Sequence, residues 1–304
     1  MAIDLTDPNH ATSSDVSRRA FVALGSGAAF AFANASAASA QSSDYGKPHP
    51  PIVPEDDPAI SVSRPKLTPK AGTPIGAYAA MPRTVTPRTA GIVVTQHIWG
   101  VDAQLRDVVR RLAKAGFIAI APQLFDRVGP VPDPDTATDY LPFAAAATKM
   151  TSQGFVTTDL LAGHEWIRSQ AANSAIGITG FCMGGSIALQ QVIDSKAYAA
   201  LAMFYGAVRP GTKSSDPTTP QTFAFVDKIA TPVLGSFGAR DTSIKAEDVV
   251  AFRAALQAKG IPNDIKLYDE AGHAFEDDTR NSYVASAAVD AWSRTLAWFG
   301  KYLA

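Results

Sequence analysis

The sequence predicts an α/β fold, with a mostly parallel sheet covered by helices on both faces. From residue 75 onward, apolar strand-like runs alternate with helix-like segments, the order that a parallel sheet requires. The chain has 304 residues, 46% of them hydrophobic, so it can bury a large core. The single cysteine lies between a strand-like run and a helix-like run. We expect one domain over residues 70–304.

The first 40 residues are predicted to be a twin-arginine signal peptide. Arg18 and Arg19 precede a mildly apolar stretch over residues 23–33, and a small-residue site, Ala-Ser-Ala at residues 38–40, closes the segment. A membrane anchor is the alternative, but the stretch is too short and too rich in Ala and Gly to span a bilayer. We expect export by the twin-arginine machinery to the periplasm or the medium, without a stable membrane anchor after cleavage.

Residues 41–69 are rich in proline and are expected to form an extended, poorly packed arm. The domain is then predicted to contain a strand over residues 91–95, a helix over about residues 102–115 and a strand over residues 117–121. Gly116 is expected to cap the helix. The helix is predicted from apolar residues at helical spacing, namely Val101, Leu105, Val108, Val109 and Leu112.

A long interruption follows between residues 128 and 154 and contains four prolines. Loops of that length are often functional. We therefore expect a rim or lid over the active site.

The cysteine stands at a sharp turn. An apolar run over residues 175–179 leads into Gly-Phe-Cys-Met-Gly at residues 180–184, and a helix-like stretch follows over residues 186–193. This layout is typical of a nucleophile elbow, with sulfur in place of the usual serine oxygen. The glycines allow a strained turn and the close approach of neighbouring backbone. The motif predicts covalent catalysis by Cys182.

An acid and a histidine follow in the order that such a sheet requires. Asp241 comes after an apolar run over residues 232–237, and His273 follows a strand-like segment over residues 264–268. Taken singly, Cys182 could be a small buried hydrophobe, Asp241 a turn residue and His273 a surface histidine. Together, each after its own strand, they favour a triad of the α/β-hydrolase type.

At these residues the sequence resembles the dienelactone hydrolase family, whose members carry Cys, Asp and His on an α/β-hydrolase fold. The resemblance extends from about Ile75 to the C-terminus. Besides the cysteine motif and Gly-His-Ala-Phe at residues 272–275, it includes Gln-His-Ile-Trp-Gly-Val at 96–101, Ala-Pro-Gln-Leu-Phe-Asp-Arg at 121–127 and Tyr-Val-Ala-Ser-Ala-Ala at 283–288.

The expected reaction is hydrolysis of a small ester or lactone through a thioester. His273, oriented by Asp241, helps to form the Cys182 thiolate, which attacks the carbonyl carbon. The oxyanion is expected to accept hydrogen bonds from the backbone N–H of Met183 and, as the resemblance implies, from that of Ile98.

The resemblance also implies substrate contacts. Family members that cleave dienelactone hold its carboxylate with two arginines, and Arg127 matches the first position whereas Asp277 stands at the second. Because Asp277 would repel a carboxylate, we expect a neutral small ester or lactone. A surface position or an ion pair is the alternative for Arg127. Trp99 and Phe181 are also expected beside the substrate.

His97 stands where the family motif carries a glutamate that is thought to contact the resting thiol. A carboxylate beside Cys182 disfavours the thiolate, and an imidazole removes this penalty. We therefore expect His97 to lie in the substrate site beside Cys182 and to ease its ionisation. The alternative is that His97 turns away and packs against Trp99 or the strand ends.

Composition and the remaining motifs exclude other classes of function. The 27 Lys and Arg residues against 28 Asp and Glu give no electrostatic reason to expect nucleic acid. Dinucleotide and phosphate-loop motifs are missing, and the five histidines lack metal-ligand spacing, so we expect neither cofactor nor metal. The alternative function is a non-hydrolytic thiol protein on the same fold that uses Cys182 for binding or redox sensing.

Overall fold

The computed structural model describes residue 49 and residues 51–209 and 223–304; the predicted signal peptide over residues 1–40 lies outside them. Within the described ranges, nine strands form a sheet in the order β1-β3-β5-β4-β6-β7-β8-β9, with β2 paired to β3. The strands are β1 (Ile60–Ser63), β2 (Lys66–Leu67), β3 (Ile75–Pro82), β4 (Gly91–Thr95), β5 (Ile118–Pro122), β6 (Ile176–Phe181), β7 (Ala200–Phe204), β8 (Val233–Gly238) and β9 (Asn263–Tyr268).

The sheet is mostly parallel, as predicted. Parallel pairing runs from β5 through β4, β6, β7 and β8 to β9. Among the described strands, β1, β2 and β3 pair antiparallel at one edge. Every residue of β4, β5, β6 and β7 is buried, as expected of parallel strands covered on both faces.

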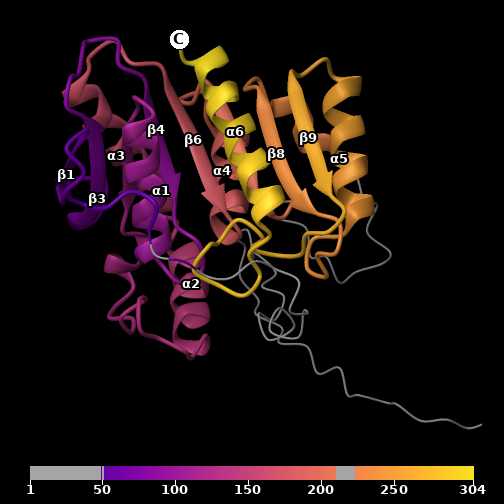
Figure 1. Ribbon diagram of the computed structural model, residues 1–304, viewed down its shortest axis with the longest axis horizontal. Helices are drawn as coiled ribbons and strands as arrows, with labels where there is room; N and C mark the ends of the chain where they lie inside the picture. Colours follow the sequence, from indigo (N-terminus) through magenta and orange to yellow (C-terminus); the bar gives the residue numbers. More distant parts are fainter. Residues whose placement is uncertain (1–48, 50, 210–222) are drawn as a thin grey trace, which may run out of the picture.

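Helices cover both faces of the sheet (Figure 1). Leu105 of α1 and Phe299 of α6 belong to one core layer, whereas Leu160 of α3, Ile187 of α4 and Phe252 of α5 belong to the other. No helix in the described ranges is long and apolar enough to cross a membrane. The helices are α1 (Ala103–Lys114), α2 (Leu141–Gln153), α3 (Val156–Gln170), α4 (Met183–Asp194), α5 (Ala246–Ala258) and α6 (Ala285–Tyr302), with the 3-10 helices η2 (Leu124–Arg127) and η3 (Ala224–Lys228).

The predicted first helix is α1, and local signals set both of its ends. The side chain of Asp102 accepts a hydrogen bond from the backbone N–H of Leu105 at 3.0 Å, which caps the N-terminus. Gly116, just past the C-terminus, has a φ of 100°, a conformation that glycine adopts without strain.

The arm over residues 41–69 differs from the prediction, because it is well packed from residue 51 onward. β1 and β2 add antiparallel strands to β3. Before them, the buried carboxylate of Asp107 accepts hydrogen bonds from the backbone N–H groups of Ile52 and Val53 at 3.1 and 2.8 Å. The prolines favoured an extended chain, but the partners that hold it lie on α1, some 55 residues away in sequence.

The interruption between residues 128 and 154 contains a helix, α2, that was not predicted. Pro142 lies in the first turn of this helix, where proline is tolerated. Tyr140 and Phe143, at the start of α2, contact the ring of Trp99 with centroid distances of 5.9 and 5.2 Å. Because Trp99 lies in the loop after β4, this segment packs over the carboxyl end of the sheet, where a rim was expected.

Candidate active site

Cys182 occupies a strained turn between β6 and α4. Its φ of 55° and ψ of −121° are unusual for a residue with a side chain, a strain that costs roughly 1–3 kcal/mol. Neighbouring backbone enforces the turn, because a Cβ added to Gly184 would collide with the carbonyl of Thr95 at the end of β4. Cys182 is a free cysteine and is partly buried at this turn.

Asp241 and His273 meet Cys182 at the carboxyl ends of β8 and β9. His273 Nε2 lies 3.1 Å from Cys182 Sγ, and His273 Nδ1 lies 2.7 Å from Asp241 Oδ2. The second carboxylate oxygen of Asp241 accepts hydrogen bonds from the backbone N–H groups of Ser243 and Ile244, at 2.7 and 3.0 Å. Because an ionised carboxylate only accepts, Nδ1 of His273 carries a proton and Nε2 is left to face the sulfur.

The three side chains shift the pKa values of thiol and imidazole toward each other. Burial favours the neutral thiol, but the charge and hydrogen bond of His273 outweigh it and lower the pKa of Cys182. Burial likewise opposes a charged imidazole, but the Cys182 charge and the hydrogen bond to Asp241 raise the pKa of His273 well above its ordinary value. The arrangement therefore favours a thiolate paired with an imidazolium.

Of the two predicted oxyanion donors, that of Met183 contacts this sulfur. The backbone N–H of Met183, at the first residue of α4, hydrogen-bonds to Cys182 and helps to lower the thiol pKa. Ile98 belongs to the loop after β4, where the isolated bridge between His97 and Gly100 shapes a tight turn.

Two tyrosines at the site were not predicted. Tyr205, just after β7, has a φ of 36° and places its ring 5.1 Å from that of His273, edge to face. Tyr140 lies close enough for the charge of Cys182 to add to the effect of burial, and together they raise the tyrosine pKa. Tyr205 stands at a strand end and is followed by glycine, a signal in the sequence that could have identified it. No local signal in the sequence indicated Tyr140.

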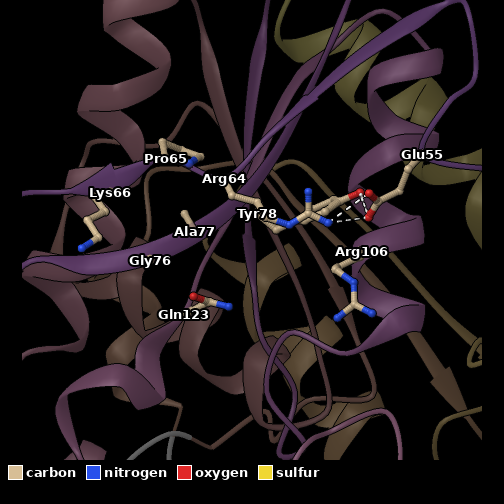
Figure 2. A pocket seen from close by; sticks show the side chains of 9 residues that line it. All are labelled: Glu55, Arg64, Pro65, Lys66, Gly76, Ala77, Tyr78, Arg106 and Gln123. Atoms are coloured by element: carbon tan, nitrogen blue, oxygen red, sulfur yellow. Dashed lines mark hydrogen bonds and ion pairs between the residues drawn. The ribbon is translucent and has the colours of Figure 1, made fainter.

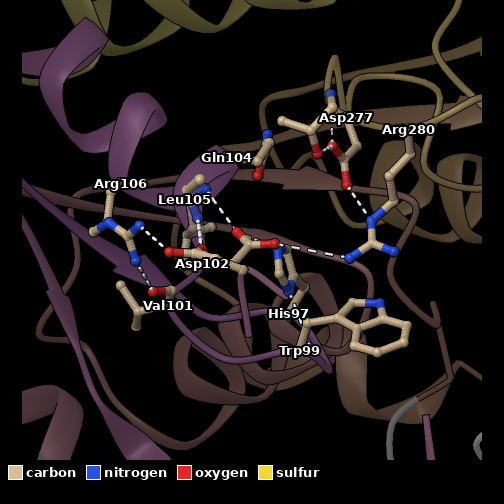
Figure 3. Close-up of polar contacts among 12 residues, drawn as sticks. His97, Trp99, Val101, Asp102, Gln104, Leu105, Arg106, Asp277 and Arg280 are labelled. Atoms are coloured by element: carbon tan, nitrogen blue, oxygen red, sulfur yellow. Dashed lines mark hydrogen bonds and ion pairs between the residues drawn. The ribbon is translucent and has the colours of Figure 1, made fainter. Parts of the chain in front are cut away.

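His97 binds Asp102 rather than the sulfur. Its Nε2 lies 3.1 Å from Asp102 Oδ1, and its Nδ1 accepts a hydrogen bond from the backbone N–H of Trp99 at 3.2 Å. The charge of His97 still contributes to lowering the pKa of Cys182. Figure 3 shows that Arg280 joins this group: its Nη2 lies 3.8 Å from Asp102 Oδ2, and its guanidinium lies 4.6 Å from the centre of the Trp99 ring.

Three residues expected to contact the substrate have other partners. Arg127 forms an ion pair with Asp159, and the ring of Phe181 is buried and stacked on Phe204. The buried carboxylate of Asp277 binds Arg280 Nε at 2.9 Å instead of standing open to repel an anion. Each of these side chains therefore has a partner within the protein, supplied by a segment distant in sequence or by a local turn.

A hollow of about 320 Å³ lies between β2, β3 and the first turn of α1 (Figure 2). Arg64 and Arg106 line it, but Glu55 and Asp135 pair with them at 2.9 and 2.6 Å, so most of the positive charge is compensated. Cys182, Asp241 and His273 do not line this hollow. Elsewhere in the described ranges, no three His, Cys, Asp or Glu side chains are grouped to hold a metal ion.

Known proteins resemble this chain over most of its length. The model of the dienelactone hydrolase family matches residues 75–303. A Salmonella typhimurium protein named "Putative carboxymethylenebutenolidase" is 34% identical over 254 residues, which cover 83% of this chain and 92% of that protein. A Methylorubrum extorquens protein of the same name is 35% identical over 230 residues, or 75% and 77% of the two chains.

A solved structure extends the likeness to three dimensions. The crystal structure of a "Putative Dienelactone Hydrolase" from Klebsiella pneumoniae has a TM-score of 0.70 and 33% identity, and the match covers 80% of this chain and all of that one. The family match includes Cys182, Asp241 and His273 and runs from the start of β3 to the end of α6. The chain therefore belongs to the dienelactone hydrolase family of the α/β-hydrolases.

Proposed function

We propose that this protein hydrolyses a small carboxylic ester or lactone through a triad of Cys182, His273 and Asp241. The observation that carries the proposal is the unbroken series of contacts from Sγ to Nε2 at 3.1 Å and from Nδ1 to the carboxylate at 2.7 Å. The names of the relatives point to the same reaction class, because a carboxymethylenebutenolidase opens a lactone.

The first half-reaction forms a thioester. The Cys182 thiolate attacks the carbonyl carbon, and the resulting oxyanion accepts hydrogen bonds from the N–H groups of Met183 and Ile98. When the intermediate collapses, the C–O bond breaks and the alkoxide takes the proton of His273 Nε2. Asp241 holds the imidazole in the orientation that this transfer needs.

The second half-reaction returns the enzyme to its resting state. His273 Nε2 removes a proton from water as the oxygen attacks the thioester carbonyl, and the C–S bond then breaks. Cys182 leaves as a thiolate beside the imidazolium, the pair that the shifted pKa values favour.

A neutral substrate suits the charges beside the site. Asp102 and Asp277 carry one negative charge each and Arg280 one positive charge, so their sum is −1 while His97 is neutral. Because Asp277 is bound to Arg280, its effect on an anionic substrate is a weak field rather than a direct contact.

Ester turnover tests the proposal against the thiol-binding alternative. Wild type is expected to release nitrophenol from a short-chain nitrophenyl ester for many turnovers, and Cys182→Ala to abolish release. Asp241→Asn is expected to lower kcat by roughly 10⁴-fold, since the wrong imidazole tautomer then faces the sulfur. The matched control, Asp194→Asn on the exposed side of α4, should leave kcat unchanged. A single stoichiometric modification of Cys182 without turnover would support the binding protein instead.

Export is proposed on the sequence of residues 1–40 alone. The protein is expected in the periplasmic or secreted fraction, and replacement of Arg18 and Arg19 by Lys should retain it in the cytoplasm. Recovery of the double variant in the exported fraction would contradict the twin-arginine route.

A further inference from the structure

The turn over residues 97–100, here called the oxyanion turn, carries one of the two predicted oxyanion donors. The carbonyl of His97 accepts a hydrogen bond from the N–H of Gly100 at 3.1 Å, and Gly100 has a φ of 91°. Ile98 lies inside the turn, so the direction of its N–H depends on the groups that hold residues 97 and 99. A displacement of 1 Å at such a donor is enough to lower the rate.

The ring of His97 holds this turn in only one protonation state. A backbone N–H can only donate, so Nδ1 of His97 accepts from the N–H of Trp99 at 3.2 Å and carries no proton itself. The proton of the neutral ring then lies on Nε2, which donates to Asp102 Oδ1 at 3.1 Å. The His97 and Asp102 side chains are only 7% and 6% exposed, so water does not readily replace these bonds.

Asp102 is itself fixed from two sides. The same Oδ1 caps α1 by accepting from the N–H of Leu105 at 3.0 Å, and Oδ2 faces Arg280. Arg280 in turn binds Asp277, whose N–H donates to the carbonyl of Ala274, the residue after His273. The oxyanion turn is thereby joined to the start of α1 and to the loop that carries the triad histidine. Figure 3 shows the series from His97 through Asp102 and Arg280 to Asp277.

We propose that His97 and Asp102 form a second histidine–carboxylate pair that positions the oxyanion turn, and that protonation of His97 releases it. A proton on Nδ1 removes the acceptor for the Trp99 N–H. The two N–H donors, that of Nδ1 and that of Trp99, then face and repel each other. His97 is thus a positioning residue that acts through the turn. This role in catalysis rests on the proposed function.

The surrounding charges set the pH at which release occurs. Burial opposes a charged His97, but Asp102 at the start of α1, aided by Asp277, outweighs burial and the opposing charge of Arg280, and the pKa of His97 is raised. The Cys182 thiolate at the elbow interacts electrostatically with the same ring. The neutral form therefore begins to be lost above the ordinary histidine pKa of about 6.5, and activity should fall as pH decreases through that range.

The kinetic test compares variants that differ in the acceptor at residue 97. His97→Asn offers a side-chain carbonyl that does not titrate, so the acid limb of kcat assigned to His97 should disappear. His97→Ala offers no acceptor and should lower kcat roughly 10- to 100-fold with little change in KM. The matched control is His164→Asn on α3, which removes a buried histidine bound to the Ala197 carbonyl and should leave the pH profile unchanged. An acid limb that persists in His97→Asn would overturn the proposal.

Asp102→Asn provides a second test that keeps the cap of α1. An amide oxygen still accepts from Leu105 and from His97, but the negative charge is gone, so the acid limb should move to lower pH. If the acid limb of kcat stays at the same pH, Asp102 does not influence the titration of His97, and the proposed histidine–carboxylate pair is wrong.

A readout independent of hydrolysis distinguishes this proposal from the proposed function. The backbone amide resonance of Trp99 should titrate with the His97 ring in wild type and stay flat in His97→Asn over about pH 5 to 9. Absence of ester turnover would refute the proposed function while leaving this titration intact. A Trp99 amide that does not titrate in wild type would refute the positioning pair, whatever the turnover.

Discussion

Arg127 and Asp159 form an ion pair that is almost fully withdrawn from solvent, with Nη2 2.6 Å from Oδ1 and side chains only 4% and 2% exposed. The guanidinium also lies 4.7 Å from the centre of the Phe155 ring. Burial raises the pKa of Asp159 to about 6 despite the neighbouring positive charge. Arg127, which the family resemblance assigned to substrate binding, therefore has a buried partner within the protein.

Removal of one partner of this pair should be more harmful than removal of both. Asp159→Ala leaves the Arg127 charge buried and unpaired, and we expect the free energy of unfolding to fall by about 3–5 kcal/mol. The double variant Arg127→Met, Asp159→Leu should regain most of that loss, measured by urea unfolding. Its kcat/KM for a neutral ester should stay within about twofold of wild type. A loss of a hundredfold or more would show that Arg127 contributes to substrate binding.

The stability of the fold should fall as pH rises through the titration of Asp278. Burial raises the pKa of this carboxyl from 3.8 to about 6, although Arg111 and His49 lie 3.8 and 3.6 Å away. Between those values the folded state holds a proton that the unfolded state has lost, so the free energy of unfolding decreases with rising pH. Asp278→Asn removes this loss and should raise Tm at pH 7.5 by about 2–4 °C.

The same substitution at Asp57 provides a control of opposite sign. The hydrogen bond from Lys114 lowers the pKa of Asp57, so its charge stabilises the fold above its unfolded-state pKa, and this stability is lost as pH falls. Asp57→Asn should therefore lower Tm at pH 7.5. If Asp278→Asn also lowers Tm, burial does not dominate the energetics of Asp278.

Alkylation of Cys182 should reveal the lowered thiol pKa directly. The chain contains one cysteine, so iodoacetamide reports on this thiol alone. The rate should reach half of its maximum below the ordinary thiol pKa of about 8.5, and His273→Gln should move that midpoint upward. His97→Glu should also raise it, because a negative charge near the thiol disfavours the thiolate, whereas an imidazole does not. A midpoint unchanged by His273→Gln would exclude the imidazole as the source of the shift.

Substrate charge preference should respond to Asp277. Asp277→Asn changes the summed charge of Asp102, Asp277 and Arg280 from −1 to zero. The ratio of kcat/KM for a carboxylate-bearing lactone over a neutral ester should then rise by about fivefold, which corresponds to about 1 kcal/mol. Asp290→Asn, which removes a carboxylate paired with Lys266 on β9, should leave the ratio unchanged. Equal ratios in both variants would show that the field of Asp277 does not reach the substrate.

The sequence by itself determined the sheet class, the bounds of α1 and the turn that carries Cys182. These features follow from local rules: a helix shows in the spacing of Leu105, Val108 and Leu112, and a strained elbow shows in its flanking glycines. The order of Cys182, Asp241 and His273 along the chain also predicted their meeting, because parallel strands end at the same edge of a sheet.

Only the tertiary structure decided which partner each polar side chain takes. Arg127 binds Asp159 from α3, the arm binds Asp107 from α1, and Tyr140 reaches the site through a helix in a proline-rich segment. A buried polar group must find a partner, and that partner is chosen by packing among segments far apart in the sequence. The spacing of residues predicts which helices and strands form, but it does not predict which of their faces pack together.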